Sequence, residues 1–353
     1  MTPGTVALFV AGAALLIGGA ELLVRGASRL ALAAGVSPLV VGLTVVAFGT
    51  SSPELAVSVQ AAWTGKVDIA LGNVVGSNIF NVLFILGLSA MVAPLTVARQ
   101  VVRQEVPVMI AVSLLLFALA FDRGIGRLDG ALLAGGLVVY TLFLLRQSRR
   151  EERNGGAEAP ADRTWRQTAT DAGVILAGLV LLVIGSNWLV DGAVAIARSL
   201  GVSDMIVGLT IIAAGTSLPE VATSVTATVR GERDIAVGNV VGSNVFNIMG
   251  VLGISALVAP ASLAVPPAML TFDMLVMIAV AVACLPVFFT SSRISRWEGG
   301  VFLAYYAAYT TYLVMAAADH DALDEYGFVM VAFVIPLTAL TLAITVWRKL
   351  RRG

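Results

Sequence analysis

The chain repeats its own sequence at an offset of 166 residues, and the repeated residues include polar ones. Residues 42–54 align with 208–220, and residues 68–81 align with 234–247. Each copy contains Gly-Thr-Ser-x-Pro-Glu followed by Gly-Asn-Val-Val-Gly-Ser-Asn. Any two apolar segments can match by chance at apolar positions, but chance does not give both of them the same polar residues in the same order. The sequence therefore indicates that one structural unit is duplicated, and the fold must contain two similar halves.

Both copies lie in a strongly apolar chain. Of its 353 residues, 58% are hydrophobic and only 12% are charged, and the mean hydropathy is +0.94. A transmembrane helix needs about 20 mainly apolar residues to cross the hydrocarbon core. Eleven stretches meet this requirement, so we expect membrane-spanning helices near residues 4–33, 37–62, 69–95, 104–121, 127–145, 170–198, 203–228, 235–260, 267–290, 297–317 and 327–347.

The strongly polar stretch 146–167 separates the two copies. Each copy holds five spans, an odd number, so the second copy must enter the membrane from the opposite side. The expected fold class is an all-α polytopic membrane protein with two inverted five-helix repeats, a ten-helix core, plus an eleventh C-terminal transmembrane helix. Inverted repeats with Gly/Pro-interrupted helices are typical of secondary transporters. We expect the first repeat at 1–145, a cytoplasmic linker at 146–169, the inverted repeat at 170–317, and the extra helix with its basic tail at 318–353.

The positions of the charges predict the orientation. With the N-terminus outside, 18 of the 22 Lys and Arg residues fall on the inner side, as the positive-inside rule favours. The first four residues carry no basic side chain, so the first apolar stretch is interpreted as a retained helix instead of a signal peptide. We therefore expect an integral protein of the cell (inner) membrane with its C-terminus in the cytoplasm. The basic residues left outside are Lys66, Arg123, Arg127 and Arg198.

Glu54 and Glu220 lie in the middle of spans that contain no Lys or Arg. A carboxylate at that depth costs about 2.5 to 3.5 kcal/mol on insertion scales, so a compensating interaction is required. The Gly-Thr-Ser-x-Pro run before each glutamate should end one half-helix and begin another, with Ser51 and Ser217 placed as in a capping box. We expect this break to leave carbonyls without helical partners, free to face an ion, near Ala47, Thr50, Ala213 and Thr216.

These groups would form a cage of oxygen atoms. Such ligands suit hard cations such as calcium and sodium. The alternative for each copy is a capped kink with a neutral, hydrogen-bonded glutamate, and the presence of two equivalent copies weighs against it. Besides the two glutamates and the carbonyls, the candidate ligands are the hydroxyls of Thr50, Ser51, Ser77, Thr216, Ser217 and Ser243 and the amide oxygens of Asn81 and Asn247.

Other residues of the two motifs have structural interpretations. We interpret the Gly-x-x-x-Gly pairs, Gly72/Gly76 and Gly238/Gly242, as sites of close helix packing. Glu21 is expected to pair with Arg25, and Asp68 and Asp234 to begin their helices. A single cysteine, Cys284, and a single histidine, His320, disfavour disulfide and soft-metal chemistry. Asparagines that either bridge helices or bind ions, an alternative that stays open here, are Asn73, Asn78, Asn239 and Asn244.

The doubled motif resembles the two alpha repeats of the sodium/calcium exchanger family within the calcium/cation antiporters. The resemblance covers spans one to ten and implies that Glu54 and Glu220 are the central calcium ligands, together with the carbonyls of Thr50 and Thr216. It also implies that spans one and six slide across the core to expose the site alternately, and that three sodium ions exchange for one calcium, although the ligand set alone leaves the stoichiometry open. The implied sodium sites draw on Ala47, Ser51, Ser77, Ala213, Ser217 and Ser243.

Three features depart from parts of this family. Potassium-dependent members carry an aspartate where this chain has Asn247, so a potassium requirement is not expected. The eleventh span, near residues 327–347, lies outside the repeat. The short linker also lacks the large calcium-sensing region of animal exchangers, so that kind of regulation is not expected.

The leading hypothesis is an antiporter that exchanges sodium for calcium by alternating access. Its expected partners are the transported calcium and sodium ions and the lipid bilayer in which it is embedded. A calcium/proton antiporter of the same superfamily is the first alternative, and a passive cation channel is a second. We expect no cofactor and no nucleic-acid partner. We also expect no enzymatic activity, because neither Ser51 nor Ser217 has a His or Lys base beside it in sequence. The oligomeric state stays open.

Overall fold

The computed structural model describes residues 3–34, 36–153, 165–200, 213–318 and 320–352. Within these ranges, nine helices are long and apolar enough to cross a membrane, or ten if one bent pair counts as a single span. This confirms a predominantly helical, polytopic membrane protein. The nine spans are Gly4–Ala33, Val67–Val92, Val101–Asp122, Arg127–Ser148, Arg166–Ser199, Arg233–Val258, Met269–Phe289, Arg296–Ala317 and Leu323–Thr341.

The bent pair lies where the first copy of the motif predicts a helix break. Helix α3 (Ala47–Thr50) follows α2 (Pro38–Val41) and the π-helical turn η1 (Gly42–Val46), and α4 (Ser52–Trp63) begins after Ser51. The two segments, Pro38–Thr50 and Ser52–Trp63, meet at 47°. Pro53 lies in the first turn of α4, where its missing N–H removes no helical hydrogen bond.

The second copy has the same break. Helix α11 (Ala213–Gly215) ends before Thr216, and α12 (Leu218–Val229) begins after Ser217, with Pro219 in its first turn. Ser51 and Ser217 adopt nearly equal backbone angles, φ −81° and ψ 10° against φ −89° and ψ 7°. The predicted span 203–228 begins within residues 201–212, which lie outside the described residues, so this span is followed only from α11 onward.

The next spans along the chain, after α4 and after α12, each contain a π-helical turn at the same place. Helix α5 (Val67–Phe80) passes into η2 (Asn81–Leu86) and α6 (Gly87–Val92). Helix α13 (Arg233–Phe246) passes into η6 (Asn247–Leu252) and α14 (Gly253–Val258). Turns of this kind occur often at functional sites. Both begin at asparagines that the sequence analysis proposes as ligands.

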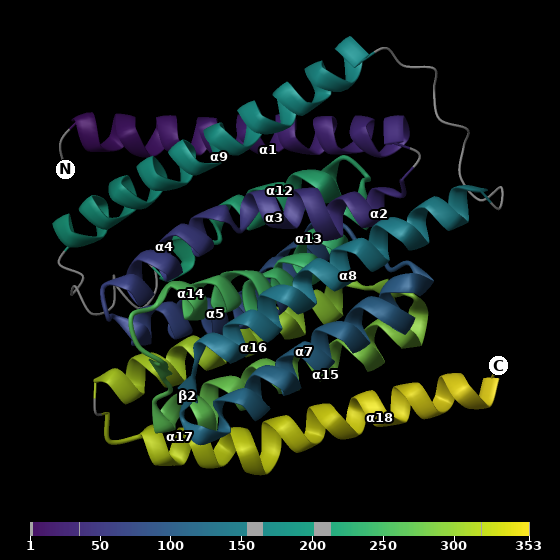
Figure 1. The fold of residues 1–353 in the computed structure, drawn as a ribbon. Coiled ribbons are helices and arrows are strands. Elements are labelled where there is room, and N and C mark those ends of the chain that lie inside the picture. Colours follow the sequence, from purple (N-terminus) through teal and green to yellow (C-terminus); the bar gives the residue numbers. More distant parts are fainter. Residues whose placement is uncertain (1–2, 35, 154–164, 201–212, 319, 353) are drawn as a thin grey trace.

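Helices α1 (Pro3–Ala34) and α9 (Trp165–Ser199) cross each other on one side of the bundle (Figure 1). Their backbones touch at glycines spaced by seven residues, Gly12 and Gly19 on α1 and Gly178 and Gly185 on α9. A Cβ atom at Gly12 would lie 2.5 Å from the Leu189 nitrogen, and one at Gly185 would lie 2.5 Å from the Leu16 nitrogen. These positions therefore require glycine, and they hold α1 and α9 together as an antiparallel pair.

The remaining helices complete the two halves. The first half continues with η3 (Val101–Glu105), α7 (Val106–Leu119), a 3₁₀ turn η4 (Ala120–Asp122) and α8 (Arg127–Arg153). The second half continues with η7 (Met269–Asp273), α15 (Met274–Ser291) and α16 (Arg296–Ala317). Over the described residues the two halves follow the same order of helices, except that the 3₁₀ turn η4 occurs only in the first half. Each half ends in a helix that follows a short loop.

Four two-residue strands lie in the loops that precede η3, α8, η7 and α16, which corrects the expectation of an all-α chain. Strand β1 (Leu95–Thr96) pairs antiparallel with β4 (Arg293–Ile294), and β2 (Gly124–Ile125) pairs with β3 (Leu263–Ala264). Each pair joins a loop of one half to a loop of the other, so the backbone groups of the loops satisfy each other. Two residues are too few to show the alternation by which a strand is recognised in sequence.

A last helical segment follows the second half. Helices α17 (Leu323–Val329), η8 (Met330–Val334) and α18 (Ile335–Arg352) lie along the edge of the bundle farthest from α1 and α9 (Figure 1). Tyr305 of α16 donates a 2.6 Å hydrogen bond to Thr338 Oγ1, and the Tyr326 hydroxyl donates to the Ala308 carbonyl at 2.9 Å. Two tyrosines thus attach this segment to α16.

The glycine pairs give different results in the two copies. A Cβ at Gly238 would lie 2.8 Å from the Leu39 oxygen, and one at Gly242 would lie 2.6 Å from the Leu43 oxygen. The predicted close packing is therefore confirmed for α13. For Gly72 and Gly76 the equivalent neighbours would be residues 205 and 209, which fall in a part of the chain that the structure does not describe.

Candidate cation site

Each buried glutamate is hydrogen-bonded by a serine of the other half. Ser217 Oγ donates to Glu54 Oε1 at 2.8 Å, and Ser51 Oγ donates to Glu220 Oε1 at 2.8 Å. All four residues are at most 1% exposed. Ser217 Oγ and Ser77 Oγ lie 3.2 Å apart, within hydrogen-bonding distance. The two interrupted helices therefore place their carboxylates in one polar cluster at the interface of the halves.

These contacts correct the predicted capping boxes. Ser51 and Ser217 do stand at the N-cap positions of α4 and α12, but neither side chain caps its own helix. The hydroxyls cross to the carboxylates of the opposite half instead. Capping would use the serine oxygen as the acceptor of a backbone N–H, whereas here each hydroxyl donates its hydrogen to a carboxylate, and hydrogen bonds to ionised groups are the stronger ones.

A second symmetric layer surrounds the glutamates. Asn73 Nδ2 donates to the Glu54 carbonyl at 3.2 Å and to Ser58 Oγ at 2.9 Å, and Thr216 Oγ1 donates to Asn73 Oδ1 at 3.2 Å. The equivalent residues of the other half repeat the pattern. Asn239 Nδ2 lies 3.5 Å from the Glu220 carbonyl and 2.9 Å from Ser224 Oγ, and Thr50 Oγ1 donates to Asn239 Oδ1 at 3.1 Å.

A network of four asparagines adjoins this layer. Asn78 Nδ2 donates to the Asn244 carbonyl at 3.2 Å, and Asn244 Nδ2 donates to the Asn78 carbonyl at 3.3 Å. Asn81 Nδ2 donates to Asn244 Oδ1 at 2.9 Å, and Asn247 Nδ2 donates to Asn78 Oδ1 at 3.2 Å. These asparagines bridge the halves, as Asn73 and Asn239 bridge neighbouring helices. The bonds of Asn73, Asn78, Asn239 and Asn244 are those that the bridging interpretation predicts.

Several oxygens of the cluster are buried and accept or donate no hydrogen bond within the protein. Since buried polar atoms are normally satisfied, these unpartnered oxygens mark places that an ion or a water molecule can occupy. Oxygen atoms that have no hydrogen-bond donor nearby are suitable ligands for a hard cation. Those belonging to predicted ligands are Glu54 Oε2, Glu220 Oε2, Asn81 Oδ1, Asn247 Oδ1 and Ser243 Oγ.

The expectation that the Ala47 carbonyl lacks a helical partner is wrong. This carbonyl accepts a 3.0 Å hydrogen bond from the Ser51 amide, so it does have a helical partner. Helix α3 ends at Thr50, and the amide of its capping residue Ser51 makes the last hydrogen bond, because Pro53 blocks no hydrogen bond before that residue. Ala213 belongs to α11 and Thr216 follows that helix, which places their backbones at the equivalent positions of the second half.

Two structural predictions away from the cluster are confirmed. Glu21 pairs with Arg25 at 2.6 Å, and it also contacts Arg230 at the end of α12. Asp68 and Asp234 lie in the first turns of α5 and α13.

The sequence analysis missed a second duplicated carboxylate. Glu105 is fully buried and accepts hydrogen bonds from the hydroxyl of Tyr140 at 2.5 Å and from the side chains of Gln100 and Gln104, each at 2.9 Å. In the second half the Tyr309 hydroxyl donates to Asp273 Oδ1 at 2.8 Å. Glu105 and Asp273 lie 168 residues apart, so a search for the repeat that allowed two extra residues near position 261 would have found them.

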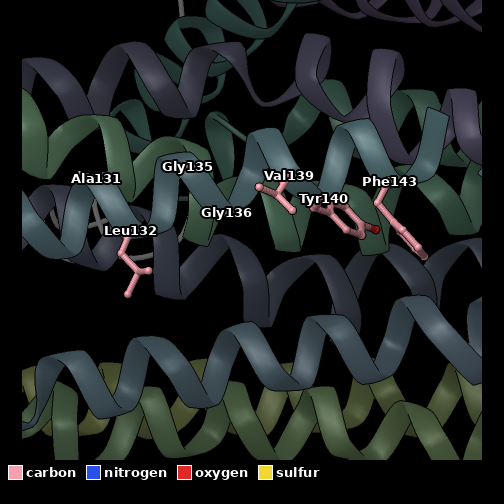
Figure 2. A pocket seen from close by; sticks show the side chains of 7 residues that line it. All are labelled: Ala131, Leu132, Gly135, Gly136, Val139, Tyr140 and Phe143. Carbon is pink, nitrogen blue, oxygen red and sulfur yellow. The ribbon is translucent and has the colours of Figure 1, made fainter. Parts of the chain in front are cut away.

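A surface groove runs along α8 and shares no residue with the glutamate cluster (Figure 2). Its volume is about 630 Å³, and its one hydroxyl belongs to Tyr140, which is engaged with Glu105. Such a groove offers no ligands for a cation. The lining residues are Ala131, Leu132, Gly135, Gly136, Val139, Tyr140 and Phe143.

Among the described residues, no three or more His, Cys, Asp or Glu side chains converge on a common point. A cation held at the cluster would therefore need amide, hydroxyl or carbonyl oxygens in addition to the two glutamates. A membrane-spanning helical bundle with a buried, oxygen-rich centre defines the class of integral membrane proteins that transport ions.

Comparison with known proteins identifies the family. Residues 4–146 and 170–315 match the family described as sodium/calcium exchanger protein. The chain belongs to this family of membrane antiporters.

Relatives and solved structures agree with that assignment. The putative antiporter CaxA of Alkalimonas amylolytica is 39% identical over 277 residues, which cover 76% of this chain and 85% of that protein. The sodium/calcium exchanger MaX1 of Methanosarcina acetivorans is 33% identical over 77% of this chain and 87% of its own length. A structure of the sodium-calcium exchanger NCX_Mj, soaked with 10 mM Na+ and 10 mM Sr2+, aligns with a TM-score of 0.76 at 30% identity and covers 90% of this chain and 99% of that one.

Proposed function

We propose that this protein is a secondary antiporter that exchanges sodium for calcium across the membrane by alternating access. The observation that carries the proposal is the group of buried, unpartnered oxygens on Glu54, Glu220, Asn81 and Asn247. Two carboxylates supply two negative charges, which one calcium ion or two sodium ions neutralise. Because the same oxygens serve both cations, sodium and calcium compete, and competition for one site is what couples their movements.

The full ligand set that we propose follows the two motifs. It consists of the side chains of Glu54 and Glu220, the hydroxyls or carbonyls of Thr50, Thr216, Ser51, Ser217, Ser77 and Ser243, the amides of Asn81 and Asn247, and the carbonyls of Ala47 and Ala213. The crossed Ser–Glu bonds support a shared site, because each half contributes a donor to the carboxylate of the other. Ser51 and Ser217 can exchange these donations for ion coordination without leaving the cluster.

The antiporter requires two halves of opposite orientation, and we propose that residues 1–145 and 170–317 are these inverted repeats. The antiparallel packing of α1 on α9 supports this assignment, because equivalent helices of inverted repeats run in opposite directions. We further propose that 146–169 is a cytoplasmic linker, that the N-terminus lies outside, and that 318–353 supplies an eleventh transmembrane helix. No covalent chemistry or cofactor is needed for this activity.

A calcium/proton antiporter is the second candidate. Glu54 and Glu220 are buried and have no Lys or Arg in contact among the described side chains, so a proton could replace calcium on each. In that case the glutamates themselves would carry the counter-ion.

Calcium-45 uptake into proteoliposomes distinguishes the two. Vesicles would be loaded with sodium, potassium or choline, and a separate arm would apply an outside pH step without a sodium gradient. Uptake from sodium-loaded vesicles alone supports sodium/calcium exchange. Uptake driven by the pH step alone supports the proton antiporter, and calcium flux without any counter-ion would contradict both.

A further inference from the structure

Two methionines contact the asparagine network from outside the ligand set. Met109 of α7 accepts a hydrogen bond from Asn244 Nδ2, with 3.4 Å between sulfur and nitrogen, and Met277 of α15 accepts one from Asn78 Nδ2 at 3.7 Å. Both methionines are buried. They lie 168 residues apart, as Glu105 and Asp273 do, so the contact is duplicated with the rest of the fold.

A thioether sulfur accepts hydrogen bonds and donates none. The edge of an asparagine amide that faces it must therefore be the NH₂ group. The backbone carbonyls of Asn78 and Asn244 take the second N–H of each amide, so both hydrogens are used and neither amide gains by turning over.

The orientation of the Asn244 and Asn78 amides determines that of the Asn81 and Asn247 amides. With its NH₂ group against sulfur, Asn244 directs Oδ1 toward Asn81 Nδ2, and Asn78 directs Oδ1 toward Asn247 Nδ2. One N–H of Asn81 and one N–H of Asn247 are thereby bonded, and the Oδ1 atoms of both residues are left buried and unpartnered. If the first amide turned over, the second would follow and would present N–H groups to the cation instead of oxygen.

We propose that Met109 and Met277 are positioning residues that hold the amide oxygens of Asn81 and Asn247 toward the transported cation, acting through Asn244 and Asn78. This inference rests on the proposed function of the cluster as a cation site. It assigns a role in ion binding to two apolar side chains that touch no ion.

The test replaces the sulfur by a carbon of similar volume. Met109→Leu and Met277→Leu remove the acceptor and leave one N–H of the adjoining amide unsatisfied. The matched control is Met274→Leu, three residues from Met277 on the same helix and equally buried, with no amide contact. The expected result is a rise of about threefold to tenfold in the apparent KM for calcium in the first two variants, as for the loss of one buried hydrogen bond, with kcat changed less than twofold. An unchanged KM, or a rise equal to that of the control, would overturn the proposal.

A binding measurement separates this proposal from the proposed function. Thermal unfolding of the purified full-length proteins would be followed with and without calcium or sodium. If neither cation raises the Tm of the unmodified protein, the cluster is no cation site and the proposed function fails. If cations raise the Tm of the unmodified protein, the relay predicts a smaller rise in Met109→Leu and Met277→Leu than in Met274→Leu. Equal rises would contradict the relay alone.

Double substitutions test the path of the effect. In an Asn81→Ala background the amide at the end of the relay is absent, so Met109→Leu should produce no further rise in KM. In an Asn247→Ala background Met109→Leu should keep its full effect, because Met109 acts on Asn81 through Asn244. Effects of Met109→Leu that are equal in both backgrounds would refute the assigned path.

Discussion

Ser217 belongs to the second half of the chain, yet its hydroxyl donates a 2.8 Å hydrogen bond to Glu54 of the first half. The equivalent pair, Ser51 and Glu220, has the same distance in the opposite direction. Each carboxylate is therefore held by the half that does not contain it. A shared site of this kind exists only when the two halves are assembled.

The glutamates should be essential for exchange. Glu54→Gln or Glu220→Gln removes one of the two negative charges of the cluster while keeping its volume, so we expect sodium-dependent calcium-45 uptake in proteoliposomes to fall to background. Folding and insertion should survive, as judged by yield and by a single symmetric peak in size-exclusion chromatography. Retained calcium flux in both variants would show that the cluster is not the transport site.

Glu105→Gln is a matched control for those variants. Glu105 is equally buried, but its three neutral donors lie outside the cluster. We expect this variant to keep exchange activity and to lose stability by about 1 to 3 kcal/mol, because the new amide opposes N–H donors where the carboxylate accepted them. The stability change would be measured as a lower Tm in detergent. Abolished exchange with an unchanged Tm would mean that Glu105 belongs to the transport path.

The crossed serines should stabilise the assembled halves. Ser217→Ala and Ser51→Ala each remove a donor from a buried carboxylate, and we expect each to lower the free energy of unfolding by about 1 to 3 kcal/mol. The control is Ser52→Ala, because the Ser52 hydroxyl donates only to the Phe48 carbonyl of its own turn. Thermal unfolding without added calcium gives the comparison. If Ser52→Ala is as damaging as Ser51→Ala, the crossed bond contributes nothing specific.

Asn247→Asp should change ion preference. The substitution adds a third carboxylate to the cluster and removes the donor that Asn247 offers to Asn78 Oδ1. Because a third negative charge favours the divalent ion, we expect the ratio of the apparent KM for sodium to that for calcium to rise by about threefold or more. Uptake assays with potassium added on either side would also show whether a potassium dependence appears. A KM ratio within experimental error of the unmodified protein would contradict the prediction.

The contact between α1 and α9 should not tolerate a methyl group. Gly185→Ala places a Cβ 2.5 Å from the Leu16 nitrogen, so the backbones must separate at a cost of about 1 to 3 kcal/mol. Gly18→Ala and Gly173→Ala on the same two helices meet nothing within 4 Å and serve as controls. Thermal unfolding and calcium uptake would be measured for all three. Equal behaviour of Gly185→Ala and the controls would show that the close approach is unimportant.

The duplicated motif predicted the main features of the fold and the cluster because polar residues in apolar spans have few uses. The break before each of the two glutamates and the pairing of Glu21 with Arg25 both follow from local sequence. The crossing of Ser51 to Glu220 does not, because a local capping box and a contact between halves use the same serine in the same position. Only the packing of the halves decides between them.

Other features lay outside the reach of sequence patterns for definite reasons. The two-residue strands are too short to show alternation. Glu105 and Met109 were missed because two extra residues near position 261 shift the repeat from an offset of 166 to one of 168. The sequence predicts no helical partner for the Ala47 carbonyl, but the Ser51 amide at the end of α3 donates to it.

The central claim is that sodium and calcium bind the same oxygens, and competition at equilibrium tests it most directly. Calcium-45 binding to the purified protein would be measured at increasing sodium concentrations, with choline replacing sodium to keep the ionic strength constant. The account predicts that sodium displaces calcium completely and that Glu54→Gln and Glu220→Gln each lose calcium binding. Calcium that stays bound at saturating sodium, or that binds equally well to both variants, would contradict it.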